Sequence, residues 1–316
     1  MEAATTAVGR SGRPEAPSLR AARRRFGESV IKGLLGLAAA ISLLTTAGIL
    51  YALVEETVVF LRAVPIHDFL FGTKWSPLFK PPSFGVLPLV AGTFATTLIA
   101  LVVAIPLGLG SAIYLSEYAR PRMRKTIKPI LELLAGVPTI VFGYFALTFF
   151  TPNVLQDLLH VKVNIFNALA AGIIMGFMII PTIASVAEDA MSSVPGSLRE
   201  GAYGLGASKL QVSTRVVFPA ALSGIVAAIV LGVSRAVGET MIVLLASGQV
   251  ASNTLDPREP HLSLASFIGS TAGGDTPTGS IEYKTIFAVG MLLFVITLIM
   301  NLISIRFVRK YRQVYE

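Results

Sequence analysis

The sequence predicts an all-α integral membrane protein with six transmembrane helices and both termini in the cytoplasm. Of its 316 residues, 53% are hydrophobic and only 14% are charged, whereas a soluble domain carries about a quarter charged residues. Five long stretches contain no Asp, Glu, Lys or Arg, and each is long enough to cross the roughly 30 Å hydrocarbon core of a bilayer. The placement of Lys and Arg gives the orientation.

The six expected helices follow from these uncharged runs. The sixth stretch, 216–247, is equally apolar apart from Arg235 and Glu239. We therefore expect helices over 31–56, 86–116, 129–150, 164–188, 216–247 and 284–306. Buried helices of a soluble protein would need shorter runs and polar faces, so the sequence disfavours that alternative.

The remaining segments divide the chain into a tail, a membrane domain and a short second tail. Residues 1–30 are basic and rich in Ala, Gly, Pro and Ser, and we expect a disordered cytoplasmic tail there. The six-span domain covers 31–308, and 309–316 forms the second cytoplasmic tail. The outside segment 57–84 contains Trp75 and several Phe residues, which suit the lipid headgroup layer or a docked partner, and the headgroup layer is favoured.

The basic residues support this topology. With the N-terminus in the cytoplasm, 19 of the 26 Lys and Arg residues lie on the cytoplasmic side, six lie outside, and Arg235 lies within a span. This asymmetry agrees with the positive-inside rule. The net charge of +8 is therefore mostly a topology signal, and the lipid bilayer, rather than a nucleic acid, is the expected partner of the basic tail.

Several kinds of chemistry are excluded or unsupported. The chain has no cysteine, so it forms no disulfide and no Cys-based metal site. His67, His160 and His261 fall in three separate outside loops, which gives no support to a metal site. No Gly-x-x-x-x-Gly-Lys-Ser/Thr loop is present, so the chain cannot hydrolyse ATP itself.

A spaced motif occupies the cytoplasmic loop before the fifth helix. Glu200-Gly201-Ala202 is followed by Gly206 and, nine residues later, by a Val-Val-Phe-Pro sequence that ends at Pro219. We expect a short helix, a sharp turn at Gly206, and a second short helix that leads to Pro219. The spacing resembles the signature of binding-protein-dependent ABC importer permeases, with conservative departures at Gly201, Val216 and Phe218. That resemblance implies a type I ABC importer permease fold, in which 198–215 couples to an ATPase.

A second motif places charges inside the fifth helix. Arg235 and Glu239 are four residues apart, so a continuous helix would bring them to one face, where they could pair. A self-neutralising structural ion pair is one reading. Polar groups within a span usually face a bundle interior or a water path, which favours a functional reading. A guanidinium also matches phosphate oxygens with a rigid fork of donors.

Further motifs sharpen the resemblance. The run 234–241, Ser-Arg-Ala-Val-Gly-Glu-Thr-Met, is similar to the inorganic-phosphate (Pst) importer permeases, as are Leu-Ser-Glu-Tyr-Ala at 115–119 and Glu-Leu-Leu-Ala-Gly-Val-Pro-Thr at 132–139. Trp-Ser-Pro at 75–77 and Phe-Gly-Val-Leu-Pro at 84–88 favour the C-type permease, PstC, over the A type. The resemblance covers about 30–310.

The resemblance implies partners and roles. A C-type permease pairs with a PstA-like permease, two PstB-like ATPases that carry the ATP and Mg, and a PstS-like phosphate-binding protein outside the membrane. This chain itself would bind no cofactor and would be no enzyme, and it would span a bacterial or archaeal cell membrane. Arg235 would contact the passing phosphate, Glu239 would orient or release Arg235, and loops 57–84 and 248–281 would receive the binding protein. The substrate passage would contain Ser234, Arg235, Glu239 and Thr240.

Three alternatives remain open at this point. The first is an ABC importer for another oxyanion or small solute, which would share the Gly206 motif but would not need the Arg235 run. An intramembrane enzyme would need a nucleophile–base pair, which Arg235, Glu239 and Glu132 do not provide. A secondary transporter would be expected to show internal repeats, and none is clear.

Overall fold

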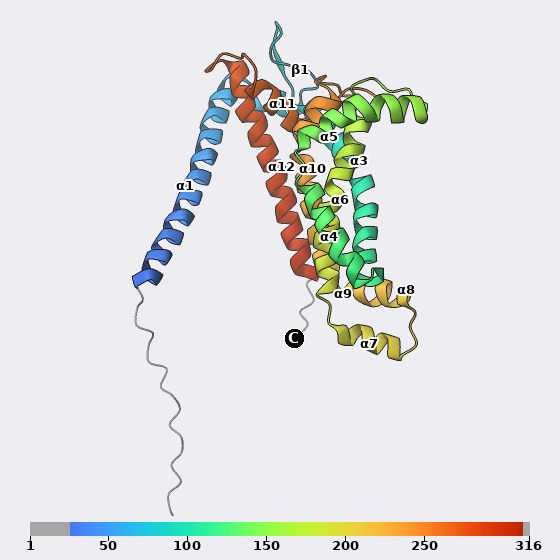
Figure 1. Ribbon diagram of the computed structural model, residues 1–316. Coiled ribbons are helices and arrows are strands. Elements are labelled where there is room, and N and C mark those ends of the chain that lie inside the picture. The colour runs from blue at the N-terminus through green and yellow to red at the C-terminus, as the bar shows by residue number, and fades with distance from the viewer. Residues whose placement is uncertain (1–25, 312–316) are drawn as a thin grey trace, which may run out of the picture. The chain divides into compact units, whose positions relative to one another are not determined.

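The computed structural model describes residues 26–311, which are mostly helical. Four helices in this range are long and apolar enough to cross a membrane, and two bent helix pairs raise the count to six if each pair is one span. The four are α1 (Phe26–Ala63), α3 (Leu87–Ile113) with the π-helical turn η1 (Tyr114–Tyr118), α6 (Ala168–Ser192) and α12 (Ile281–Tyr311). They correspond to the expected helices at 31–56, 86–116, 164–188 and 284–306, although α6 begins only at Ala168 (Figure 1).

The chain divides into two compact units between Ala52 and Leu53, and each is described by itself. In the first unit, residues 26–52 form a single helical stretch whose apolar side chains, among them Leu34, Leu43 and Leu44, are exposed. A helix that is hydrophobic all round is suited to lipid or to the interior of an assembly. This helix begins at Phe26, within the tail expected at 1–30; the rest of that expectation, and the end of the tail at 309–316, lies outside the described residues.

Close packing of α3 against α6 forms the centre of the second unit. A Cβ added at Gly176 would lie 2.8 Å from the Val103 Cβ, and one added at Gly172 would lie 2.6 Å from the Ile99 Cβ. Small residues of this kind let two helix backbones approach within a membrane. Helix α10 (Leu222–Val237) packs against the same helix α6. These contacts make α6 the central element of the unit.

The third expected helix is wrong as a continuous span over 129–150. Helix α4 (Pro121–Ala135) starts earlier and ends at Gly136, and α5 (Thr139–Phe145) continues into the π-helical η2 (Ala146–Leu158). The two parts meet at 85°. The cause lies in the sequence, because Pro138 removes a backbone donor and drives the preceding residue out of helical geometry.

The fifth expected helix is also wrong as one span over 216–247. Helix α8 (Lys209–Val212), the π-helical η3 (Ser213–Val217) and α9 (Phe218–Ala220) form one arm, and α10 departs from it at 74° after Ala221. Helix α10 then ends at Val237, and helical structure resumes only at 241–247, including η4 (Val243–Ser247). An apolar composition indicates which residues lie within the membrane, but it does not indicate where the backbone changes direction. The sequence therefore did not predict these two breaks.

The segment before α3 is folded onto the bundle. It contains α2 (Ile66–Phe71) and a two-stranded antiparallel ribbon, β1 (Trp75–Ser76) and β2 (Ser83–Phe84), in which Trp75 pairs with Phe84. Trp75 is only 7% exposed and meets Phe267 of α11 (Leu264–Ala272) edge to face at 4.9 Å. The expectation that these aromatics lie in the headgroup layer is therefore wrong for Trp75 and Phe69, which are core residues, while Phe71 and Phe79 are exposed.

Candidate functional site

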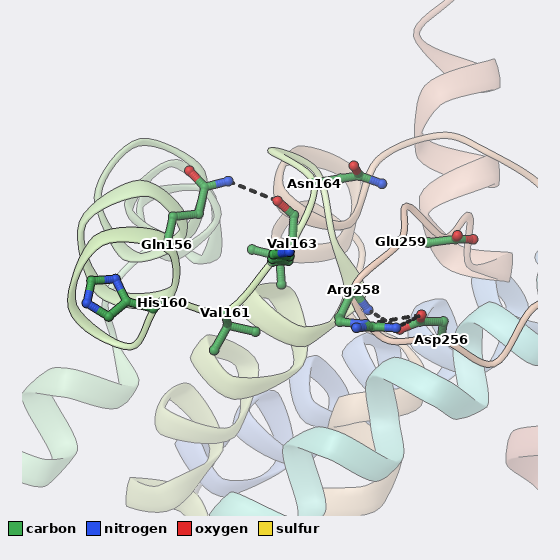
Figure 2. A pocket seen from close by; sticks show the side chains of 9 residues that line it. Gln156, His160, Val161, Val163, Asn164, Asp256, Arg258 and Glu259 are labelled. Atoms are coloured by element: carbon green, nitrogen blue, oxygen red, sulfur yellow. Dashed lines mark hydrogen bonds and ion pairs between the residues drawn. The ribbon is translucent and has the colours of Figure 1, made fainter.

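A polar groove opens at the end of the bundle opposite α7 (Gly196–Gly204) (Figures 1 and 2). It has a volume of about 680 Å³, and its lining comes from residues 156–164 and from Asp256, Arg258 and Glu259. The Arg258 guanidinium donates to the Asp256 carboxylate at 2.6 Å, and its backbone N–H donates as well. These hydrogen bonds lower the pKa of Asp256 to about 2, so the pair stays ionised at neutral pH. The groove presents fixed charges of both signs.

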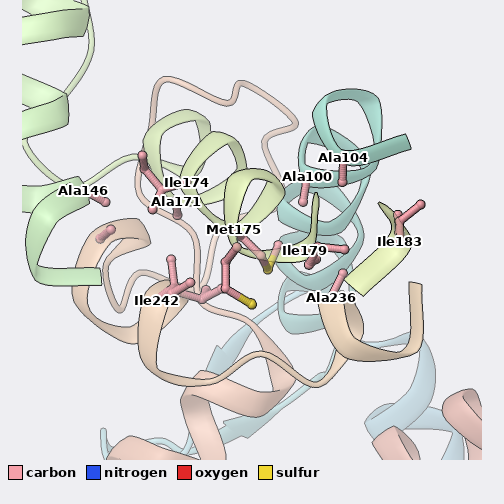
Figure 3. Packing of buried hydrophobic residues seen from close by; sticks show 13 residues of the cluster. Ala100, Ala104, Ala146, Ala171, Ile174, Met175, Ile179, Ile183, Ala236 and Ile242 are labelled. Atoms are coloured by element: carbon pink, nitrogen blue, oxygen red, sulfur yellow. The ribbon is translucent and has the colours of Figure 1, made fainter. Parts of the chain in front are cut away.

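Arg235 does not line this groove; it lies in the last turn of α10 and faces α6. Its Nη1 donates to the Thr182 hydroxyl oxygen at 3.0 Å. Its neighbour Ala236 belongs to the apolar cluster of α3, α6, α10, η2 and the segment 241–247, together with Ile179 and Ile183 (Figure 3). One guanidinium N–H is used by Thr182, and an arginine carries five. The side chain is therefore anchored on α6 with capacity for a further acceptor.

Glu239 does not form the expected pair with Arg235 among the interactions of the described residues. It is 8% exposed, and its Oε1 accepts hydrogen bonds from the backbone N–H groups of Met241 (3.1 Å) and Ile242 (3.2 Å). The expectation of a shared helix face is wrong because α10 ends at Val237, so residues 235 and 239 are not four positions apart on one helix. Glu239 instead caps the helical segment 241–247, where a carboxylate is favoured.

The other two expected passage residues point elsewhere. The Ser234 hydroxyl donates to Asn301 Oδ1 of α12 at 3.1 Å. The Thr240 hydroxyl approaches the Gly238 carbonyl at 3.4 Å, and its methyl group lies against Gly269 of α11. Arg235 therefore faces α6 and Ser234 faces α12, while Glu239 and Thr240 shape the break that follows α10. The four expected passage residues are close in sequence, but their side chains do not face one common surface.

The expected helix–turn–helix before the fifth span is present. Helix α7 and helix α8 are joined by a turn in which Gly206 has φ = +82°. That conformation suits glycine, because a side chain at positive φ is strained. Ser208 and Gln211 form a reciprocal capping box at the start of α8. Pro219 lies near the end of the arm formed by α8, η3 and α9, two residues before the break at Ala221.

The surface of this turn is open and partly apolar. Glu200, Gly201 and Gly206 are exposed, and Ala202 is half-buried against the apolar cluster that contains Val212 and Val217. Leu205 is 91% exposed. Tyr203 and Leu210 of the same segment are exposed as well, and apolar side chains exposed together mark an interaction surface more often than a single one does.

A buried ionic cluster lies between α4 and α6, and the sequence did not predict it. Glu188 has no exposed side-chain surface, and it contacts Arg124 and accepts from Lys128 Nζ at 2.8 Å. Lys128 also contacts Asp189, and the Ser192 hydroxyl donates to Glu188 at 2.8 Å. Glu188 and Asp189 follow an uncharged run in the sequence. Nothing in the sequence, however, shows that they contact basic residues about 60 positions away. Within residues 26–311, no group of three His, Asp or Glu side chains could hold a metal.

Comparisons with known proteins agree with this architecture. Residues 104–313 match the family described as binding-protein-dependent transport system inner membrane component. The chain is 36% identical over 247 residues to the probable ABC transporter permease protein YqgH of Bacillus subtilis, covering 78% of this chain and 79% of the relative. It is 32% identical over 303 residues to the phosphate transport system permease protein PstC of Haemophilus influenzae, covering 90% and 94%.

Solved structures share the fold at low sequence identity. A bacterial alginate ABC transporter, in complex with an alginate-bound periplasmic protein, aligns with a TM-score of 0.61 and 16% identity over 89% of this chain and 96% of that chain. The MetNI methionine ABC transporter in an inward-facing conformation aligns with a TM-score of 0.53 and 20% identity, over 72% and 95%. At these identities the likeness concerns the fold alone, and it matches the fold class expected from the Gly206 motif.

Proposed function

The chain belongs to the family of binding-protein-dependent transport system inner membrane components, and we propose that it works as the permease subunit of an ATP-driven phosphate importer. It is a multi-pass protein of the cell membrane and not an enzyme. The observation that carries the substrate assignment is 32% identity to PstC permeases over about nine-tenths of the chain. The assignment concerns half of a passage, since a permease of this kind works with a second one.

The placement of Arg235 supports phosphate as the substrate. Moving an unaccompanied anion through a low-dielectric passage is prohibitive without a compensating charge. Arg235 is the only charged residue of α10, and its contact with Thr182 leaves donors for an oxyanion. We assign Arg235 the contact with passing phosphate. The role of Glu239 in orienting or releasing Arg235 requires it to leave the cap on 241–247.

The partners follow from the family and from two surfaces. The turn at 198–215, with exposed Glu200 and Leu205, is the surface we assign to the ATPase. The complete importer would contain a PstA-like permease, two PstB-like ATPases and a PstS-like binding protein. Loops 57–84 and 248–281, which lie at the end of the bundle opposite α7, would receive the binding protein (Figure 1).

Reconstitution tests the function directly. The chain is assembled with its partner permease, ATPase and binding protein in liposomes, and uptake of radioactive phosphate is measured with and without ATP. We expect uptake that needs both ATP and the binding protein and that unlabelled phosphate inhibits more strongly than sulfate or molybdate. Uptake of one of those other oxyanions in place of phosphate would contradict the assignment.

A further inference from the structure

Arg199 joins α7 to the ends of two long helices. Its Nη2 and Nε donate to Glu117 Oε1 at 3.0 and 3.3 Å, and Glu117 lies in η1 at the end of α3. Its Nη1 donates to the Val194 carbonyl at 2.6 Å, and its Nη2 to the Met191 carbonyl at 2.8 Å, in the last turn of α6. One guanidinium thus binds a carboxylate from one helix and the carbonyl end of another.

The surroundings make this contact strong. The Glu117 side chain is only 4% exposed and that of Arg199 is 21% exposed. Removal of one partner from such a pair leaves a poorly hydrated charge, which costs more than the pair itself contributes. The Met191 carbonyl belongs to the negative end of the α6 dipole, where a cation is favoured. The Ser116 hydroxyl also donates to Glu117 Oε1 at 3.1 Å, which fixes the acceptor.

Little else attaches α7 to the bundle. No residue of α7 is fully buried, and a Cβ added at Gly196, Gly201 or Gly204 would meet no atom within 4 Å. Half-buried Ala202 contributes a small apolar contact. Arg199 is therefore the main polar connection between this exposed helix and the helices that cross the membrane.

We propose that Arg199 is the positioning residue through which α7 moves α3 and α6, so that a displacement imposed on α7 reaches the transmembrane helices. The proposal rests on the proposed function, in which 198–215 docks the ATPase. Helix α6 carries Met191 near one end and Thr182 nine residues earlier, about 14 Å along the axis. Because Thr182 binds Arg235, and α3 packs tightly on α6, a shift of this helix pair displaces the arginine as well.

The test compares variants in the reconstituted importer, with ATP hydrolysis and phosphate uptake measured on the same liposomes. Arg199→Met removes every contact, Arg199→Lys keeps the charge but not the fork, and Glu117→Gln keeps an acceptor without the charge. We expect Arg199→Met to assemble with the ATPase and hydrolyse ATP, while phosphate imported per ATP falls roughly tenfold. Arg199→Lys and Glu117→Gln should lose less.

A matched control and a double variant separate coupling from general damage. Arg122 is an exposed arginine of α4 at the same end of the bundle, and Arg122→Met should retain wild-type uptake per ATP. Arg199→Met combined with Glu117→Gln should be no worse than Arg199→Met alone, because both changes act on one contact. If Arg199→Met does not assemble with the ATPase, the phosphate imported per ATP by Arg199→Lys and Glu117→Gln tests the proposal instead.

Three results would overturn the inference. The first is a wild-type ratio of uptake to hydrolysis in Arg199→Met, or in the two milder variants if Arg199→Met does not assemble. The second is loss of ATPase binding in Arg199→Lys and Glu117→Gln, which would make the pair part of the docking surface, and the third is additive losses in the double variant. Failure of the unaltered complex to import phosphate would instead contradict the proposed function. The two failures are therefore distinguishable.

Discussion

The Arg235 guanidinium and the Thr182 hydroxyl meet at 3.0 Å, which ties the charged end of α10 to the middle of α6. Thr182 follows Pro181, and a proline inside a helix removes one hydrogen bond and opens a site for local adjustment. The anchor of the arginine is thus a residue at an irregular point of the central helix. This arrangement makes Thr182 a second determinant of where the positive charge lies.

Thr182→Val keeps the shape of the side chain and removes its hydroxyl. Since hydrogen bonds to charged groups contribute about 1.5–3 kcal/mol, we expect phosphate uptake to fall roughly tenfold. Thr182→Ser retains the hydroxyl and serves as the control, with uptake close to wild type. Equal uptake by the valine and serine variants would show that Thr182 does not position Arg235.

Arg235→Ala removes the cation but leaves Glu239 on the backbone N–H groups of Met241 and Ile242, because the two side chains form no ion pair among the described residues. We expect Arg235→Ala, and also the double variant Arg235→Ala with Glu239→Ala, to fold and to assemble with the ATPase but not to transport phosphate. Arg235→Lys should also transport poorly, since a point charge lacks the planar fork. Copurification of the ATPase reports assembly, and uptake of radioactive phosphate reports function. Wild-type uptake by the double variant would make Arg235 a structural residue.

Gly206 has positive φ and open space around its α-carbon, so the effect of a substitution on the isolated chain is limited to backbone strain of about 1–2 kcal/mol. We expect Gly206→Trp to reach the membrane and to uncouple ATP hydrolysis from uptake, because the indole would occupy the docking surface. Gly206→Asn should retain most uptake because asparagine tolerates this conformation, and Gly196→Ala in the preceding helix α7 is the control. Normal uptake by Gly206→Trp would argue against docking at 198–215.

Glu188 should contribute more to stability than its neighbour Asp189. Glu188→Gln leaves Arg124 and Lys128 without their buried partner, and we expect a loss of about 1–3 kcal/mol in the free energy of unfolding. Asp189 is 62% exposed and also contacts Lys128, so Asp189→Asn should cost less than about 1 kcal/mol. Denaturant titration in detergent measures both. Equal losses would mean that the burial of Glu188 confers no additional stability.

Orientation in the membrane is tested by labelling. Cysteines introduced at Ser197 in α7 and at Thr278, both exposed, would be the only thiols in the chain. The distribution of basic residues predicts that a membrane-impermeant maleimide reaches Thr278→Cys from outside and Ser197→Cys only after the cytoplasmic side is opened. Labelling of both from one side would contradict the six-span topology.

Local signals in the sequence predicted the turn between α7 and α8 well. The spacing from Glu200 to Pro219 specified two short helices and the turn at Gly206, because glycine and proline impose backbone geometry directly. The breaks at Pro138, Ala221 and Gly238 were harder, since hydropathy reports depth and not direction. The breaks were decisive for Glu239, whose role depends on where α10 ends.

Contacts between distant residues were beyond the reach of the sequence. Composition assigned Trp75 to the headgroup layer or to a docked partner, whereas its contact with Phe267 places it in the core. The pairs of Glu188 with Lys128 and of Glu117 with Arg199 join residues 60 and 82 positions apart. Each charge was visible at the edge of an apolar run, but its partner depends on how the helices pack.

The close packing of α3 against α6 also affects which mutations of the gene the protein tolerates. At Gly108, Gly172 and Gly176, even a methyl group would lie within 3.0 Å of a branched side chain of the facing helix. Every amino-acid replacement that a single-base change makes in a glycine codon introduces a side chain. Random mutation should therefore inactivate this protein readily at these three codons, in alleles in which the Arg235 and Gly206 motifs are both intact.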